Sequence, residues 1–232
     1  MLIVFFLFIK SAIAKDSMSC TYDENILNFA KNDVENRLSQ LKEGYGLSYV
    51  KRKTDIDGMV QIYKYSPQKN GKGEWSAVKS AKSDNKYESK SWDNDALFIL
   101  REFDFENLKC KSVTKDSWVL EMPTLAMFKV NSKNNGDFDN LFRAEVVLNK
   151  TSKSFTNFKI FSIETFSPEF GITVTNFQQT HTLSEAWHKG PIVSVTQEQL
   201  VEGKAGFIVP IQERNMISYF AFELINFKKE NN

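Results

Sequence analysis

The sequence predicts a mainly β protein with an N-terminal helix, in which a large antiparallel sheet, curved or closed part of the way into a barrel, packs on one or two helices. Three observations support this prediction. Helical periodicity is confined to one early segment, most later segments alternate apolar and polar residues, and turn-forming residues separate these segments at short intervals.

Composition indicates one globular domain over residues 15–232. The chain has 232 residues, 41% of them hydrophobic and 25% charged, which suffices for one well-buried core. The net charge is +1, and only five of the 30 basic residues are arginines. The planar guanidinium group of arginine is favoured for binding phosphates and bases. Because arginines are few, nucleic acid is not expected as a partner.

Residues 1–14 are predicted to be a signal peptide. An apolar run of eight residues precedes Ala12-Ile13-Ala14, which has the small-x-small pattern of a cleavage site. The run is too short to span a bilayer, so we expect an exported protein, in the bacterial periplasm, rather than an integral membrane protein. No basic residue precedes the run and Lys10 follows it, so a non-cleaved interfacial anchor is the alternative. Cys20 fits a lipid-attachment motif poorly.

The two cysteines, Cys20 and Cys110, are expected to form a disulfide because their number is even and the chain carries an export signal. Two buried thiols are the alternative. So few cysteines and histidines disfavour a zinc site, and no cofactor motif is present.

The helix is predicted to follow Thr21-Tyr22-Asp23-Glu24, which has the form of a capping box. Apolar residues then recur at helical spacing as far as Leu41, and Gly44 supplies a stop. We expect an amphipathic helix of about twenty residues whose apolar stripe packs on the protein's own sheet.

The strands are expected in hairpin order, about ten in all. Residues 47–53 and 59–66 flank the turn pair Asp57-Gly58, and Tyr63 and Tyr65 share a face. Further strands are predicted at 75–79, 109–114, 117–122 and 124–130, and residues 96–108 are ambiguous between helix and strand.

The segment 141–181 reads as three long strands joined by turns at Asn149-Lys150-Thr151-Ser152 and at residues 167–171. In the middle strand, Phe155 and Phe161 are expected on one face, with Phe158, Ile160 and Phe166 on the other. Strands at 192–201 and 206–212 are separated by a turn at Glu202-Gly203.

The last strand, 216–227, is predicted to be apolar on both faces, with Phe220, Phe222 and Leu224 on one side and Tyr219, Ala221 and Ile225 on the other. Together with the segment 141–181, this gives more apolar sheet surface than one helix can cover.

Catalytic chemistry has little support. No nucleophile elbow, metalloprotease helix or phosphate-cradling glycine loop occurs. His181, His188 and Glu185 form the only polar cluster that we would examine as a catalytic site.

The order of one helix and about ten antiparallel strands is similar to that of the outer-membrane lipoprotein carrier family and its lipid-binding relatives. The resemblance would cover residues 21–227, and it implies an incomplete barrel whose concave face receives acyl chains. None of the family's functional residues can be matched to a position in this sequence.

We therefore expect a non-enzymatic exported protein that binds a lipid or another apolar small molecule on the concave face of its sheet. A structural or interaction protein of the cell envelope, partnered by another envelope protein, is the alternative, and an uncharacterised hydrolase is the second alternative. The residues expected to line the binding surface are Phe158, Ile160, Phe166, Phe220, Phe222 and Leu224.

Overall fold

A computed structural model describes residues 20–41, 44–68, 73–79, 96–97, 108–122, 141–206 and 208–227. Over these residues the α-helix α1 (Glu24–Leu38) is continued by a short 3-10 helix, η1 (Ser39–Leu41), and Ala96 and Leu97 are also helical. Its strands are β1 (Tyr45–Thr54), β2 (Val60–Pro67), β3 (Gly73–Lys79), β4 (Lys109–Val113), β5 (Ser117–Met122), β6 (Phe142–Asn149), β7 (Ser154–Ser162), β8 (Ile172–Glu185), β9 (Ile192–Ala205) and β10 (Val209–Asn226).

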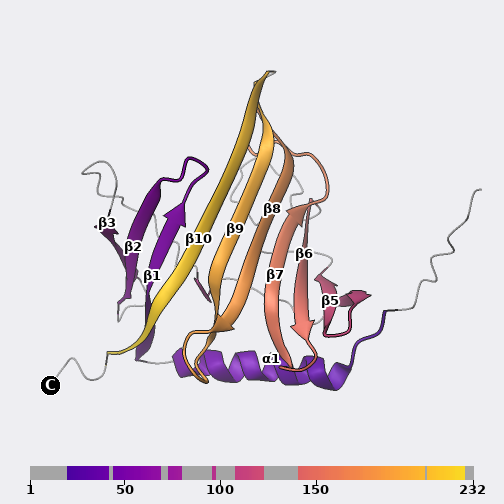
Figure 1. The fold of residues 1–232 in the computed structure, drawn as a ribbon, viewed down its shortest axis with the longest axis vertical. Helices are drawn as coiled ribbons and strands as arrows, with labels where there is room; N and C mark the ends of the chain where they lie inside the picture. Colours follow the sequence, from indigo (N-terminus) through magenta and orange to yellow (C-terminus); the bar gives the residue numbers. More distant parts are fainter. Residues whose placement is uncertain are drawn as a thin grey trace, which may run out of the picture.

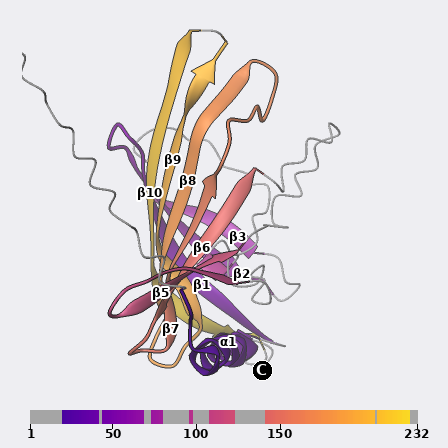
Figure 2. The ribbon, with the colours of Figure 1, turned by 90° about the vertical axis from the view of Figure 1, so that its right-hand side faces the viewer.

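All ten strands belong to one antiparallel sheet in the order β3-β2-β1-β10-β9-β8-β7-β6-β5-β4 (Figure 1). Strands that are neighbours in the sheet are also consecutive in sequence, except at the β1–β10 pair, where the first and last strands meet. The sheet is twisted and open, ending at β3 and β4 (Figure 2). The predicted fold class, mainly β with an N-terminal helix, is therefore confirmed, and the sheet does not close into a barrel.

The helix begins later and ends earlier than the sequence predicted. Asp23, not Thr21, is the N-cap, and its carboxylate accepts hydrogen bonds from the backbone N–H groups of Asn25 and Ile26 at 2.8 and 3.4 Å. Aspartate is a strong N-cap because its charge also favours the positive end of the helix dipole. The α-helix ends at Leu38, and η1 continues to Leu41, so the predicted stop at Gly44 lies just beyond.

The first core cluster lies between α1 and the half of the sheet that ends at β4. Leu27, Ala30 and Val34 form the buried stripe of the helix, at the spacing expected for one face. The other buried residues of the cluster are Leu108, just before β4, and the strand residues Trp118, Leu120, Met122, Phe142, Ala144, Val146, Leu148, Phe155, Phe158, Ile160, Leu183 and Ile192. The predicted packing of the helix on the protein's own sheet is thus confirmed.

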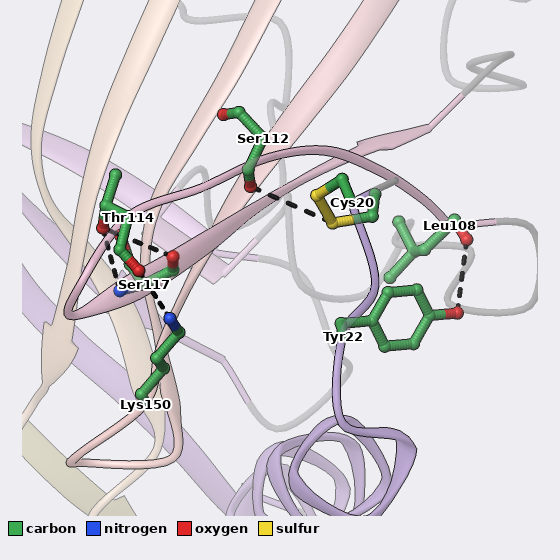
Figure 3. Close-up of a disulfide and its surroundings, with 8 residues drawn as sticks. Cys20, Tyr22, Leu108, Ser112, Thr114, Ser117 and Lys150 are labelled. Carbon is green, nitrogen blue, oxygen red and sulfur yellow. Dashed lines mark hydrogen bonds between the residues drawn. A yellow bond between two sulfur atoms is a disulfide. The ribbon is translucent and has the colours of Figure 1, made fainter. Parts of the chain in front are cut away.

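A disulfide joins Cys20, just before α1, to Cys110 in β4, and confirms the predicted pairing (Figure 3). Beside it, the Tyr22 hydroxyl donates a hydrogen bond to the carbonyl of Leu108 at 3.4 Å. The N-terminal end of the helix is therefore fixed to the edge of the sheet. A disulfide is consistent with an oxidising, exported location.

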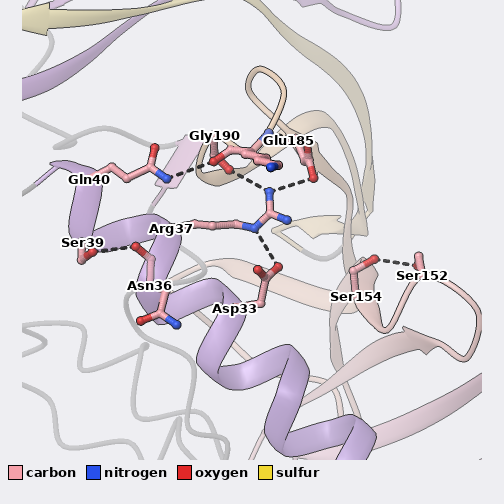
Figure 4. A network of polar contacts seen from close by, with 10 residues as sticks. Asp33, Asn36, Arg37, Ser39, Gln40, Ser152, Ser154, Glu185 and Gly190 are labelled. Atoms are coloured by element: carbon pink, nitrogen blue, oxygen red, sulfur yellow. Dashed lines mark hydrogen bonds and ion pairs between the residues drawn. The ribbon is translucent and has the colours of Figure 1, made fainter.

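The other end of the helix is fixed by Arg37 (Figure 4). Its Nε lies 2.7 Å from the Asp33 carboxylate, and one Nη lies 2.7 Å from Glu185, near the β8–β9 turn. The same Nη donates to the carbonyl of Gly190 at 3.2 Å. The hydrogen bond and charge of Asp33, with those of Glu185, raise the pKa of Arg37 against the opposing effect of burial.

Of two predicted hairpins, one differs in detail from the structure and one is confirmed. The β1–β2 connection is a five-residue loop from Asp55 to Met59, in which the Asp55 carboxylate accepts from the N–H groups of Asp57 and Met59. Gly58 lies in it with φ 76°, as the predicted turn pair requires. The turn predicted at Asn149–Ser152 is confirmed, and the Asn149 side chain accepts from two N–H groups there.

The middle strand of the segment 141–181, β7, has fewer large apolar side chains on the face away from the core than predicted. The register of β7 against β6 shifts between Val147 and Leu148, which leaves Thr156 as an extra residue. A bulge of this kind reverses the alternation, so Phe155 is buried in the same cluster as Phe158 and Ile160. The prediction that Phe155 lies on the opposite face was wrong. Phe161 is on that face and has the ammonium groups of Lys111 and Lys159 over its ring.

The turn predicted at Glu202-Gly203 is also wrong, because both residues lie within β9 and the chain turns after Ala205. Gly203 is required there for another reason. A Cβ on it would lie 2.1 Å from the carbonyl oxygen of Thr173, where the register of β8 shifts. The two strands predicted at 206–212 and 216–227 are instead parts of one strand, β10, which runs from Val209 to Asn226. The strand predicted at 124–130, residues 98–107 and the leader at 1–14 lie outside the described residues.

Candidate ligand-binding surface

The residues predicted to line a ligand site are not brought together on one surface. Phe158 and Ile160 are buried in the first core cluster, where α1 covers them. Phe166 is half-buried, with its ring centroid 5.1 Å from that of Phe142. These residues therefore hold the sheet against its helix and against the β7–β8 connection, and a ligand would reach Phe158 or Ile160 only if α1 moved.

The remaining predicted residues are divided by a bulge in β10. Ser48 pairs with Glu223 and Val50 pairs with Phe220, so one residue of β1 stands opposite two of β10. Ala221 absorbs the extra length with φ 53°, in the left-handed region. The alternation reverses there, and the predicted grouping of Phe220 with Phe222 was wrong: Phe222, like Tyr219, contacts Tyr49, whereas Phe220 shares the opposite face with Val50.

Leu224 lies on the helix-facing side of the sheet, as Phe222 does, and it pairs with the buried Leu47. Its exposed fraction is 43%, almost the same as the 44% of Phe220 on the other side. The two residues are thus equally accessible apolar groups on opposite faces of one strand.

Aromatic side chains gather on the helix-facing side of the sheet at β1, β2, β3 and β10. We call this group the aromatic cluster, and its members are Tyr49, Tyr63, Tyr65, Trp75, Tyr219 and Phe222. Tyr49 is at its centre, stacked on Tyr65 with centroids 5.0 Å apart and edge-on to Trp75 at 5.6 Å. The rings come from four strands because alternate residues of paired strands share a face.

The inner part of the aromatic cluster is a second core. Tyr49, Tyr65 and Tyr219 are buried there, together with Leu97, and Leu38 and Leu41 reach it from the end of α1. Tyr63, Trp75 and Phe222 are only partly buried, so the rim of the aromatic cluster is in contact with solvent.

A cation accompanies the rings. Lys51 shares the face of Tyr219 and Tyr63, its cross-strand partners, and its Nζ lies 5.1 Å from the Trp75 ring centroid and 5.9 Å from that of Tyr219. Both distances are within the range of cation–π attraction. The Tyr219 hydroxyl donates to Gln197 Oε1 at 3.0 Å. This surface thus combines aromatic rings, hydroxyl groups and the positive charge of Lys51.

His181 and Ser194 form a close pair, but their surroundings are structural. His181 Nδ1 lies 2.9 Å from Ser194 Oγ, and Gln179 Nε2 lies 2.6 Å from His181 Nε2. Ser194 Oγ donates to the carbonyl of Thr196 at 3.1 Å. Burial lowers the pKa of His181 to about 3, so the imidazole is neutral near pH 7. A buried serine already bonded to a backbone carbonyl has no path to a substrate.

Glu185, predicted with His181 and His188 as the cluster to examine, belongs to a different network. The backbone N–H of Lys189 and the Arg37 guanidinium lower its pKa, so it is ionised at neutral pH. His188 is exposed in the adjoining turn. Among the described residues no group of histidine, cysteine, aspartate and glutamate side chains could hold a metal ion.

The sequence predicts that Tyr63 and Tyr65 share a face, but it does not predict the aromatic cluster as a whole. The signal was present in the alternation Tyr49, Lys51 and Lys53 in β1, which places ring and charge on one side. The pairing of β1 with β10, which brings Tyr219 and Phe222 next to Tyr49, cannot be predicted from the sequence.

Within the part of the chain that the structure describes, no helix has both the length and the apolar character needed to cross a bilayer. No family model, curated protein or solved structure matches this chain. Any functional assignment therefore depends on the chain's own geometry.

Proposed function

We propose that this protein is a non-enzymatic binding protein of an exported compartment, which holds a lipid or another apolar small molecule at the rim of the aromatic cluster. The observation that carries this proposal is the position of Trp75, Tyr63 and Leu224, which are aromatic or aliphatic, partly exposed and on one side of an open sheet. Surfaces of this kind commonly bind ligands, because uncovered apolar area is otherwise unfavourable.

The chemistry of the surface favours an amphipathic ligand. Acyl or ring groups would contact Trp75 and Leu224, and an acidic headgroup would pair with the Lys51 ammonium group beside Trp75. Tyrosine hydroxyls at the rim can bond to ester or hydroxyl oxygens without a further charge.

The bacterial periplasm is the compartment that we propose, from the predicted signal peptide together with the disulfide. An open antiparallel sheet over one helix is also consistent with the analogy to lipoprotein carriers, in which acyl chains occupy the concave face. That analogy rests on element order alone.

Phe220 and Leu224 provide a matched test, since they are equally exposed on opposite faces of β10. Uptake of a fluorescent fatty acid by delipidated protein would be titrated for wild type, Leu224→Ser and Phe220→Ser. We expect Leu224→Ser to weaken binding about tenfold, because roughly 1.5 kcal/mol of apolar contact is lost. Phe220→Ser should change affinity less than about twofold.

Two results would contradict the proposal. Wild-type protein that takes up no fatty acid would remove its basis, and binding that is lost in Phe220→Ser but kept in Leu224→Ser would place the ligand on the opposite face. Mass spectrometry of material that co-purifies with the native protein would then identify the ligand class.

A second candidate, an envelope interaction protein, is favoured by the opposite face. Phe220 and Met216 are exposed there on β10, near Val50 of β1. Size-exclusion chromatography with crosslinking separates the two functions. An oligomer that Met216→Ser/Phe220→Ser dissociates would favour the interaction protein, and a monomer that binds fatty acid would favour the carrier.

A further inference from the structure

Strands β8, β9 and β10 extend beyond the rest of the sheet, at the end opposite α1 (Figure 1). Their far ends are in register, with Ala205 paired to both Ile172 and Val209. The Gly206 N–H donates to the Gly171 carbonyl at 2.6 Å, which links the turn before β8 to the turn between β9 and β10. Two turns distant in sequence are thus held together at one point of the molecule.

Three apolar side chains of the described residues lie at this point, which we call the distal tip: Phe170, Ile208 and Val209. Phe170 is fully exposed, Ile208 is 85% exposed and Val209 is 57% exposed. Phe170 and Ile208 are the two most exposed large apolar side chains of the described residues. Their exposure is unfavourable in water, and the extension below them gives them no core to fold back upon.

We propose that the distal tip inserts into the interfacial region of a lipid bilayer. A phenylalanine side chain buries about 150 to 250 Å², and only one of the three described side chains of the distal tip is aromatic, so together they fall short of the roughly 800 Å² that a stable protein interface buries on each partner. A bilayer requires no surface of complementary shape, so a few exposed apolar side chains suffice for reversible binding. The extended ribbon also keeps its backbone paired up to the turn, so that shallow insertion of the side chains leaves few backbone groups unsatisfied.

The charges beside the distal tip favour apolar insertion over electrostatic attraction. Glu169 and Lys204 are exposed next to the two turns and carry opposite charges. Binding should therefore depend little on whether the lipid headgroups are anionic, unlike the binding of a basic surface. This inference is independent of the ligand proposed for the aromatic cluster, because the two sites share no residue.

The test is co-flotation of the full chain with vesicles of phosphatidylcholine, and of phosphatidylcholine with phosphatidylglycerol. We expect wild-type protein to float with both. The tip variant Phe170→Ser/Ile208→Ser should bind at least tenfold more weakly, since two large apolar contacts are lost. The matched control is Ile56→Ser/Val78→Ser, which removes two exposed apolar residues from the β1–β2 loop and from β3 and should float like wild type.

A second readout locates the contact. Phe170→Trp should gain fluorescence that brominated lipids quench, measured as the difference from wild-type protein, whose own tryptophans provide the background. The proposal is overturned if wild type does not float, or if the tip variant floats as well as wild type, which would assign the binding to another segment such as the leader. It is also overturned if the distal tip instead joins two copies of the chain, seen as a dimer that the tip variant dissociates without any vesicle binding.

Discussion

Phe158 faces His181 across the β7–β8 pair, with their ring centroids 6.4 Å apart. The apolar ring helps to exclude water from the imidazole, while Gln179 and Ser194 occupy its two nitrogens. These hydrogen bonds fit one tautomer of the neutral imidazole, in which Nδ1 donates to Ser194 and Nε2 accepts from Gln179. A proton added to Nε2 would lose its hydrogen bond and create a buried charge, so His181 is a neutral part of the core.

Acid should therefore destabilise this protein through His181. The folded-state pKa of about 3 lies below the ordinary value of 6.5, so between these pH values the unfolded chain binds one more proton than the folded protein. The free energy of unfolding is expected to fall by about 1.4 kcal/mol for each pH unit below about 6.5. Above that pH neither state binds the proton, and the contribution of His181 does not change. Urea unfolding between pH 5 and 7 measures this slope.

His181→Gln keeps a polar side chain that cannot be protonated in this range, so its stability should depend much less on pH than that of wild type. His188→Asn, which replaces the exposed histidine of the β8–β9 turn, is the matched control and should retain the wild-type slope. Equal slopes for wild type and His181→Gln would show that His181 has the same pKa in the folded and unfolded states, which would contradict its lowered pKa.

Reduction of the disulfide should cost a large share of the stability. Cys20 and Cys110 are separated by 90 residues, and closure of so long a loop stabilises by about 4 to 5 kcal/mol in the chain-entropy treatment. We expect Cys20→Ser, Cys110→Ser and the double variant to have equal urea midpoints, because each removes the same crosslink. Additive losses in the double variant would contradict this account. Wild type treated with a reductant provides the comparison.

Arg37 should be more important for stability than other surface arginines. Its side chain is only 18% exposed and contacts Asp33, Glu185 and the carbonyl of Gly190. We expect Arg37→Met to lower the free energy of unfolding by about 1 to 2 kcal/mol, because two carboxylates and a carbonyl lose a partner. Arg214, 65% exposed and 3.9 Å from Glu198, is the control, and Arg214→Met should cost less than about 0.5 kcal/mol.

A double-mutant cycle with Glu185→Gln isolates the pair that joins the helix to the β8–β9 turn. A coupling of about 0.5 to 1 kcal/mol is expected. A coupling of zero would mean that Arg37 acts through Asp33 and the Gly190 carbonyl, and that the ion pair with Glu185 does not contribute to stability.

Ala221 should respond to substitution in the opposite sense from an ordinary strand residue. Its φ of 53° is costly for any side chain with a Cβ, and most costly for a β-branched one. Ala221→Gly is expected to raise the free energy of unfolding by up to about 1 kcal/mol, and Ala221→Val to lower it by about 1 to 2 kcal/mol.

Ala77, exposed in β3 without a positive φ, is the matched control, and there glycine should destabilise while valine is tolerated. The same ranking of glycine and valine at both positions would contradict the bulge in β10. Urea unfolding of the four variants decides between the two outcomes.

Local chemistry explains which predictions were accurate. The helix from the periodicity of Leu27, Ala30 and Val34, the turn at Asn149–Ser152 and the Cys20–Cys110 pair each depend on neighbouring residues or on the cysteine count. The N-cap was misplaced because Thr21 and Asp23 are both good caps, and only the backbone conformation selects between them.

The facial assignments failed where a single extra residue enters a strand. Thr156 in β7 and Ala221 in β10 each reverse the alternation, so Phe155 joins the core and Phe220 leaves the side of Phe222. A bulge changes every side chain that follows it, yet it depends on the partner strand, which the sequence of one strand does not reveal.

The amino-acid order by itself determined that this chain is a β protein with one leading helix and a crosslink, because propensity, periodicity and turn chemistry act over a few residues. Only the tertiary structure decided which faces are covered. The pairing of β1 with β10 joins segments some 170 residues apart in the chain (Val50 with Phe220), and it sets Tyr49 beside Tyr219 and Phe222. Such a contact is selected by the burial of the whole sheet and leaves no local trace in either strand.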